Sequence, residues 1–252
     1  MILPYRAKGM TSKAALEDQL RLTFSSENWR FSQDNHVSIS ENWASEKMKR
    51  PSLFNGEVLI AQPIRSSDGN FFIQLFSSDY ASLRYWQKMP GVDEFRLPFG
   101  LPALRTLDGY FVMGRMSSKT ANSGMVYFPS GTLSGEDLIG SDADCFSRSV
   151  MRELKEETGL ENRDVSLGHR WLVIETRKSL ACFVDAKLRF SRDELLERFS
   201  GFRQTQGADA ELEELVFVKQ DKDLISLDTP IAQKRFFDMI FQKRVPDCFF
   251  FT

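Results

Sequence analysis

Residues 152–160 read Arg-Glu-Leu-Lys-Glu-Glu-Thr-Gly-Leu. They end a segment in which Phe146, Val150 and Leu154 recur every four residues, a spacing that predicts one apolar helix face over about 142–158. At about 100° per residue, the three glutamates of the run spread over an arc of about 100° that borders this face. The glycine of the run suits the left-handed position that ends many helices. The sequence therefore predicts a helix that places three carboxylates beside a buried surface.

Like charges three and four residues apart make this helix costly unless something offsets them. Glu153 is paired in this way with Glu156 and Glu157, at a few tenths of a kcal/mol per pair. Arg152 reaches Glu156 at i+4, but the other two carboxylates have no obvious helical partner. Mg²⁺, with Mn²⁺ as an alternative, prefers such oxygen ligands and shares them with substrate phosphates. A solvated acidic face is the other reading, and the glycine loop 128–131 just upstream favours the metal site over it.

The run matches the second half of the Nudix box, Arg-Glu-aliphatic-x-Glu-Glu-x-Gly-aliphatic, at every specified position. The chain thus resembles the Nudix hydrolases, which implies an α/β/α sandwich with a mixed sheet and a loop-helix-loop over about 131–160. The resemblance also implies a pyrophosphohydrolase that cuts a phosphoanhydride in a nucleoside diphosphate linked to another moiety. By the same resemblance Glu153, Glu156 and Glu157 would bind the metal, with Glu157 also catalytic. Arg152 and Gly159 would be structural, Arg152 through a bond to an upstream acid.

The first half of the box departs from the family. The family places 13 residues between its first glycine and its arginine, whereas 20 separate Gly131 from Arg152 here. Two acids could then take the upstream position. Asp137 keeps the spacing from Gly131 and Asp144 keeps the spacing to Arg152; we favour Asp144, because helix geometry fixes its distance from Arg152 while loop spacing is elastic.

A further acid outside the box is expected from the family, on a loop before a late strand. Residues 207–218 read Gly-Ala-Asp-Ala-Glu-Leu-Glu-Glu-Leu-Val-Phe-Val and resemble that segment. Glu211 is the first choice for a catalytic base or metal ligand and Glu213 the second. An acidic solvated loop is the alternative for either residue.

Phosphate contacts require cations near the glycine loop. Arg115, at the end of a predicted strand, resembles an arginine often found there in the family, and Gly131 would approach the substrate with its backbone. Arg177 and Lys178 are weaker candidates, since single surface cations are usually solvated. An aromatic platform for a base has four candidates, among which the sequence does not choose: Tyr110, Phe111, Trp86 and Trp171.

A second, scattered resemblance points to the Nudix pyrophosphatases that act on UDP-glucose and UDP-galactose. It rests on Leu53-Phe54-Asn55-Gly56, on the hairpin and the Asp79-Tyr80 helix that follow, and on Ala103-Leu104-Arg105-Thr106-Leu107-Asp108-Gly109. Those proteins also have a long box loop. The reaction it implies yields UMP and a sugar 1-phosphate.

Composition limits the remaining classes of protein. With 252 residues, 42% hydrophobic and 27% charged, the chain can bury a substantial core. A net charge of −2 gives no field to attract nucleic acid or acidic lipid, so we expect a small nucleotide partner and no nucleic acid polymer. No segment approaches the roughly 20 apolar residues of a membrane helix, and three scattered cysteines fit a reducing compartment. We expect a cytoplasmic protein without a membrane partner.

The chain divides into an extension, residues 1–52, and a Nudix domain, residues 53–252. The extension is α+β, with a helix-like stretch at 12–22 and few strand signals, and residues 90–102 are a loop because of their prolines and glycines. The periodicity predicts these other elements: strands at 58–61, 71–76, 110–116, 125–128, 171–175, 180–188 and 215–219, and helices at 78–88, 193–199 and 230–243.

Two other readings remain open beside the enzyme. The stretched loop fits a catalytically weak Nudix-fold module that binds or regulates through nucleotides, and a purely structural acidic helix would show no response to metal. The apolar run Phe249-Phe250-Phe251 should be covered, either by its own domain or across a homodimer.

Overall fold

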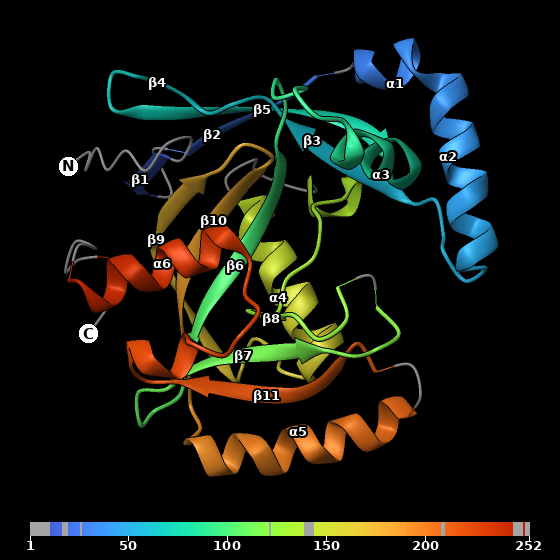
Figure 1. The fold of residues 1–252 in the computed structure, drawn as a ribbon. Helices are drawn as coiled ribbons and strands as arrows, with labels where there is room; N and C mark the ends of the chain where they lie inside the picture. Colours follow the sequence, from blue (N-terminus) through green and yellow to red (C-terminus); the bar gives the residue numbers. More distant parts are fainter. Residues whose placement is uncertain are drawn as a thin grey trace.

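The computed structural model describes residues 11–16, 20–25, 27–120, 122–138, 144–207, 210–243 and 249. These residues form a mixed α/β fold with two β-sheets (Figure 1). No helix among them is long and apolar enough to cross a membrane.

The larger sheet has seven strands. Its order is β1-β9-β10-β6-β7-β11, with β8 paired to β7. β10 and β6 run parallel, and the other neighbours are antiparallel. The strands are β1 (Thr11–Leu16), β6 (Leu97–Arg105), β7 (Phe111–Met116), β8 (Val126–Tyr127), β9 (Val165–Glu175), β10 (Ser179–Leu188) and β11 (Leu212–Val218).

The smaller sheet has four strands and lies at the top of Figure 1 beside the first three helices. β5 is its centre, parallel to β2 and antiparallel to β3 and β4. The strands are β2 (Leu20–Ser25), β3 (Glu57–Ala61), β4 (Arg65–Ser67) and β5 (Asn70–Asp79). The predicted turn before residue 71 is present, and Asp68 and Gly69 in it have positive φ angles of 50° and 78°.

The helices are α1 (Arg30–Asp34), α2 (His36–Lys49), α3 (Tyr80–Lys88), α4 (Cys145–Thr158), α5 (Arg192–Gln206) and α6 (Ile231–Phe241). Among the described residues, the 3₁₀ turn η2 (Gly135–Leu138) lies between β8 and α4, and the 3₁₀ turn η5 (Asp221–Leu224) lies between β11 and α6. The predicted helices at 78–88, 142–158 and 230–243 are thus confirmed within a few residues, whereas α5 continues a further seven residues beyond the predicted end at 199.

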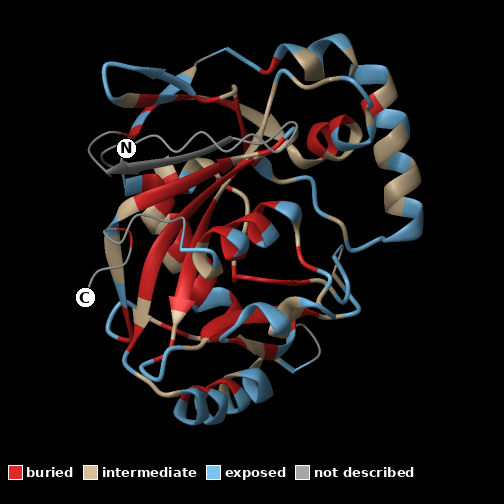
Figure 2. Ribbon diagram, turned by 60° about the vertical axis from the view of Figure 1, so that its left-hand side comes forward, coloured by how far each residue is buried: buried red, intermediate tan, exposed pale blue. Residues whose placement is uncertain are grey.

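Helices cover both faces of the larger sheet. Gly100 of β6 faces α4, because a Cβ there would lie 2.8 Å from Val150 Cγ2. The next residue, Leu101, points to the other face, and its register partner Phe183 stacks on Phe236 of α6 with ring centroids 4.5 Å apart. Figure 2 shows the resulting buried interior along the strands. The predicted apolar face of α4 is confirmed, since Phe146, Val150 and Leu154 are all fully buried.

The predicted loop at 90–102 is wrong for its second part, which is strand β6. Leu97 N–H donates to Lys178 O beside β10, so alternate residues from Leu97 onward face β10. The backbone nitrogens of Pro98 and Pro102 point the other way, toward β7. That strand pairs with β6 only at Arg105↔Phe111. Their missing N–H groups therefore cost no ladder bond, which is how two prolines are tolerated in this strand.

The predicted helix at 12–22 is also wrong, because the segment contributes to strands β1 and β2. In β2 buried Leu20 and Leu22 alternate with exposed Arg21 and Thr23, a period of two that a helix would not bury. β1 belongs to the larger sheet and β2 to the smaller one. The division at residue 52 remains a prediction about folding units, and the segment before it supplies strands to both sheets.

The C-terminal aromatic run packs on its own chain where it is described. Phe249 is buried, with its ring 6.2 Å from that of Phe236. Phe250 and Phe251 lie outside the described residues. Cys145 and Cys182 are buried free thiols.

Candidate active site

Helix α4 presents its glutamates at two levels of burial. The exposed fractions of Glu153 and Glu157 are 8% and 6%, whereas Glu156 is exposed. The helix ends at Gly159, whose φ of 73° is left-handed as expected. A Cβ at Gly159 would also lie 2.5 Å from the Phe202 ring of α5, so the glycine allows α5 to pack close beside the carboxylates.

The glycine loop touches the helix directly at Gly131. A Cβ at this position would lie 1.9 Å from Glu153 Oε1, so any side chain here would force the carboxylate to move. The neighbouring backbone N–H of Ser130 donates to Glu157. The loop backbone and the carboxylates thus form one wall, as the resemblance implied for this part of the chain.

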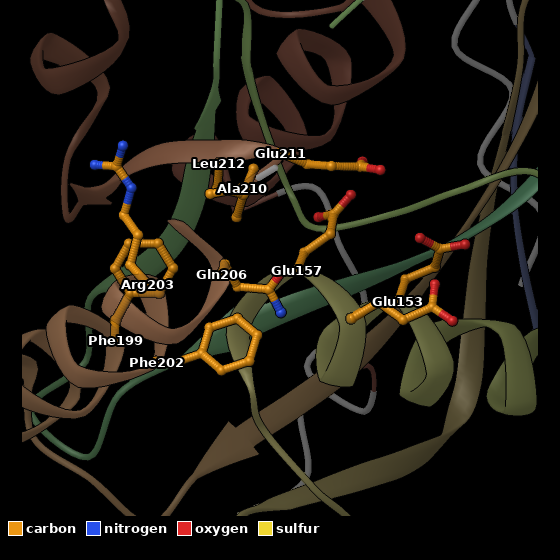
Figure 3. Close-up of a pocket in the computed structure, with 10 residues that line it drawn as sticks. Glu153, Glu157, Phe199, Phe202, Arg203, Gln206, Ala210, Glu211 and Leu212 are labelled. Atoms are coloured by element: carbon orange, nitrogen blue, oxygen red, sulfur yellow. The ribbon is translucent and has the colours of Figure 1, made fainter. Parts of the chain in front are cut away.

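Glu211 joins the α4 glutamates in one hollow of about 310 Å³ (Figure 3). Figure 3 shows Glu211 directly before β11, with Phe199, Phe202 and Gln206 of α5 on the other side of the hollow. The hollow is lined by Glu153, Glu156, Glu157, Phe199, Phe202, Arg203, Gln206, Ala210, Glu211 and Leu212. Glu213, the second choice for the late acid, is not among them, and its carbonyl accepts a hydrogen bond from Arg203.

The surroundings of Glu153, Glu157 and Glu211 in the hollow disfavour the ionised form of these carboxylates. Burial raises the pKa of Glu153 to about 7, and Glu156 and Glu211 add to the rise while Arg152 opposes it. The pKa of Glu157 is raised well above its usual range, by burial first and then by the charges of Glu153 and Glu211. The pKa of Glu211 is raised by desolvation of its carboxylate in the hollow and by Glu156, although the residue as a whole is exposed. A bound cation would relieve all of these costs together.

Arg152 ties the helix to the loop through Asp137. Its Nη2 lies 3.1 Å from Asp137 Oδ2 and its Nε 3.3 Å from Oδ1, and Asp137 is almost fully buried. The same guanidinium donates from Nη1 to Glu153 Oε1 at 2.6 Å and to Glu156 Oε2 at 3.3 Å. Arg152 therefore contacts the loop acid and two of the α4 carboxylates at once, and its structural role remains a prediction.

The structure corrects the preference for Asp144 as the acid bonded to Arg152. Asp144 is exposed and lies 3.9 Å from Arg148. It precedes the helix by one residue and lies eight positions before Arg152, which is about 12 Å along the axis at 1.5 Å per residue. Asp137 reaches Arg152 because η2 folds back beside α4, and the extra residues of the loop follow Asp137 rather than precede it.

The predicted substrate cations lie away from the carboxylates. Arg115 Nε donates to Glu214 Oε1 at 2.7 Å, in a shallow hollow that Tyr110 also lines. Arg177 pairs with Asp93 at 2.6 Å. Lys178 Nζ donates to three carbonyls at the end of α3. Of the aromatic candidates, Phe111, Trp86 and Trp171 are buried in the core.

Sequence reasoning missed the α5 side of the hollow and Tyr127. Phe202 and Gln206 lie beyond the predicted end of α5, so a longer helix assignment would have found them. Tyr127 directly precedes the loop 128–131. Burial, together with the nearby charges of Glu157 and Glu211, raises its pKa to about 12, and Asn122 Nδ2 donates to its hydroxyl at 3.2 Å.

The carboxylates of the hollow are chemically suited to a hard divalent cation, although their side chains are not already arranged around a common metal position. Within the ranges described above, no three His, Cys, Asp or Glu side chains are already arranged to hold a metal ion. Glu157 Oε2, however, is buried without a hydrogen-bond partner in this part of the chain. An orphaned carboxylate oxygen among further carboxylates is a donor set that suits Mg²⁺ or Mn²⁺.

Comparisons with known proteins give only distant structural likenesses. No family model and no curated protein matches the sequence. The MutT protein from Methanosarcina mazei Go1 is 18% identical with a TM-score of 0.39, over 60% of this chain and 96% of that one. A C. elegans Ap4A hydrolase is 14% identical with a TM-score of 0.38, over 59% of this chain and 97% of that one. A Nudix hydrolase from M. smegmatis, RenU, is 11% identical with a TM-score of 0.36, over 60% and 87%.

These likenesses do not place the chain in a family. Each one spans most of the other protein and leaves about two fifths of this chain unmatched. Their TM-scores are too low to carry an argument, and the functional reasoning below rests on the chain's own residues.

Proposed function

We propose that the chain is a Mg²⁺-dependent Nudix pyrophosphohydrolase that cuts a phosphoanhydride in a nucleoside diphosphate linked to another moiety. The observation that carries this proposal is the gathering of Glu153, Glu156, Glu157 and Glu211 in one hollow beside the glycine loop. Four carboxylates gathered in one hollow favour a bound cation, and a cation held there is available to a phosphate.

Glu153, Glu156 and Glu157 would hold the metal. When bound, Mg²⁺ supplies charge neutralisation for the phosphates and makes a coordinated water more acidic. Arg152 is a positioning residue, because it bonds Glu153 and Glu156 from one side and Asp137 from the other.

Glu211 is our choice for the proton acceptor. It comes from a different element than the other glutamates and closes the hollow opposite α4 (Figure 3). Its raised pKa brings it closer to the range in which a carboxylate can take a proton from an attacking water. The aromatic residues Phe199 and Phe202 line the hollow on the α5 side.

The finer substrate is proposed from sequence alone. The matches at 53–56, around Asp79 and over 103–109 favour a UDP-sugar, which would give UMP and a sugar 1-phosphate. A screen of nucleoside diphosphate sugars, dinucleoside polyphosphates, ADP-ribose and nucleoside triphosphates would identify it.

The experiment for the enzyme is product release with and without Mg²⁺ or Mn²⁺. We expect Glu156→Gln and Glu157→Gln to remove metal-dependent turnover, since each deletes one anionic ligand. Glu213→Gln is the matched control, because this exposed glutamate lies outside the hollow. Full activity in both α4 variants would refute the proposal.

A nucleotide-binding module is the second candidate. It is favoured by the contact of Arg152 with Glu153 and Glu156, which neutralises part of the charge that a metal would need. Metal-dependent nucleotide binding without turnover across the same screen would establish this candidate instead.

A further inference from the structure

A second hollow, about 360 Å³ in volume, adjoins the glycine loop. Ser130, Gly131 and Thr132 of the loop line it, and so does Tyr127. Gly131 therefore connects this hollow to the carboxylates, since a Cβ on it would meet the Glu153 carboxylate. A ligand whose phosphates lie at the glutamates can extend past Gly131 into this hollow, which we call the loop cavity.

The loop cavity is suited to an uncharged group. Its walls include the hydrophobic side chains of Leu83, Leu97, Phe99, Ile231 and Ala232. Its remaining described walls are formed by Tyr80, Arg84, Gln87, Asn122, Tyr127, Ser130, Gly131, Thr132, Ser179, Pro230 and Gln233.

The cavity offers no uncommitted charge among these residues. Arg84 is the one charged side chain, and its Nη2 is paired with Glu46 Oε2 at 3.3 Å. Its Nη1 donates to Gln87 Oε1 at 3.2 Å. An additional phosphate would find no unpaired cation here, whereas a flat ring with hydrogen-bonding edges would find aromatic, amide and hydroxyl groups.

One wall of the loop cavity is α3, which follows the central strand of the smaller sheet. This helix is fixed at its start, where Asp79 accepts from Ser82 N at 2.8 Å and Asn55 accepts from Ala81 N at 2.7 Å. It is fixed at its end by Lys178, whose Nζ donates to the carbonyls of residues 86, 87 and 89 at 2.7–3.1 Å. Tyr80 and Gln87 are thus carried on a helix anchored at both ends, which favours a precise wall over a mobile one.

We propose that the loop cavity binds the nucleoside of the substrate and that Tyr80 and Gln87 of α3 determine which nucleoside is accepted. This inference rests on the proposed function for the position of the phosphates. The smaller sheet then has a role in the reaction, because it carries a wall of the substrate site.

The first test needs neither metal nor turnover. Uridine, adenosine, ribose and methyl glucoside are titrated onto the full chain, and binding is followed by saturation-transfer NMR. We expect the nucleosides to bind and Gln87→Ala to weaken one of them about three- to tenfold, the range of one lost hydrogen bond. Gln33→Ala, an exposed glutamine on α1 outside the cavity, is the matched control.

Melting curves of both variants verify that they fold, which is expected because Gln87 is exposed at the cavity mouth. The proposal would be overturned if the nucleosides fail to bind, or if ribose or methyl glucoside binds as tightly as the nucleosides. It would also be overturned if Gln87→Ala leaves nucleoside binding unchanged. With a hydrolysed substrate in hand, Gln87→Ala should raise KM by a similar factor and leave kcat within about twofold.

The two proposals fail in different ways. Nucleoside binding that depends on Gln87 in a chain that hydrolyses nothing would refute the proposed function and support the cavity assignment. Metal-dependent hydrolysis with KM unchanged in Gln87→Ala and Tyr80→Phe would support the enzyme and overturn the cavity assignment.

Discussion

Asp137→Asn should weaken the fold and the site together, because Asp137 anchors the guanidinium that holds the carboxylates. The native pair has two contacts, at 3.1 and 3.3 Å, and the acid is almost fully buried while 28% of the Arg152 side chain remains exposed. Asparagine keeps the shape and loses the charge. The expected loss is about 1.5–3 kcal/mol in the free energy of unfolding, the range of hydrogen bonds to charged groups.

Thermal or urea unfolding measures this loss. At about 2–4 °C per kcal/mol for a chain of this size, the melting temperature should fall by roughly 3–12 °C. Metal affinity or kcat should fall by about 10- to 100-fold, as for other residues that orient metal ligands.

Asp144→Asn is the matched control. Asp144 is exposed and 3.9 Å from Arg148, so the same substitution there should change stability by less than about 0.5 kcal/mol. Equal losses in the two variants, or a larger loss at Asp144, would refute the assignment of Asp137 as the acid of the box.

Three further predictions concern the hollow itself. Gly131→Ala should lower kcat by about 100-fold, because its Cβ would displace the Glu153 carboxylate by an ångström or more, whereas Gly201→Ala on α5, where a Cβ meets nothing, should have no effect on kcat. Without metal, the free energy of unfolding should fall as pH rises from about 4.5 to about 7, because the unfolded chain releases the Glu153 proton near pH 4.5 and the folded chain only near pH 7. Unfolding curves measured across this pH range would show a flat profile if the pKa of Glu153 is not raised. Mg²⁺ at 100 times its Kd should stabilise the chain by about 2.7 kcal/mol in a thermal-shift assay, and Glu157→Gln should abolish that shift while making the metal-free protein more stable; a shift retained in this variant would exclude Glu157 as a ligand.

The acidic helix could be predicted from sequence because its information is local. The apolar residues four apart and the terminal Gly159 specify α4 without reference to the rest of the chain, and both are present in the structure. Glu211 was placed in the hollow by its position before a late strand, and the structure brings it there. Its catalytic role remains a prediction.

The errors came from residues whose role depends on a distant partner. Pro98 and Pro102 indicate a loop by composition. Only the pairing of β6 with β10 on one side reveals that their missing N–H groups face the other side and cost no hydrogen bond of the sheet. The spacing to Arg152 favoured Asp144 over Asp137, because the point at which the long loop is inserted is set by the fold of η2 and not by the count of residues. Arg115 was chosen because it resembles an arginine often found at the end of that strand in the family, and it pairs with Glu214 on the neighbouring strand.

The pairing of β1 with β9 has a consequence for how the chain is made. The nearest register partners, Leu16 and Arg170, are 154 residues apart in sequence. At about 5–20 residues per second, a ribosome needs roughly 8–30 s after making β1 before its partner strand exists. During that interval β1 has no edge to join in the larger sheet, so its final pairing is a late event in synthesis.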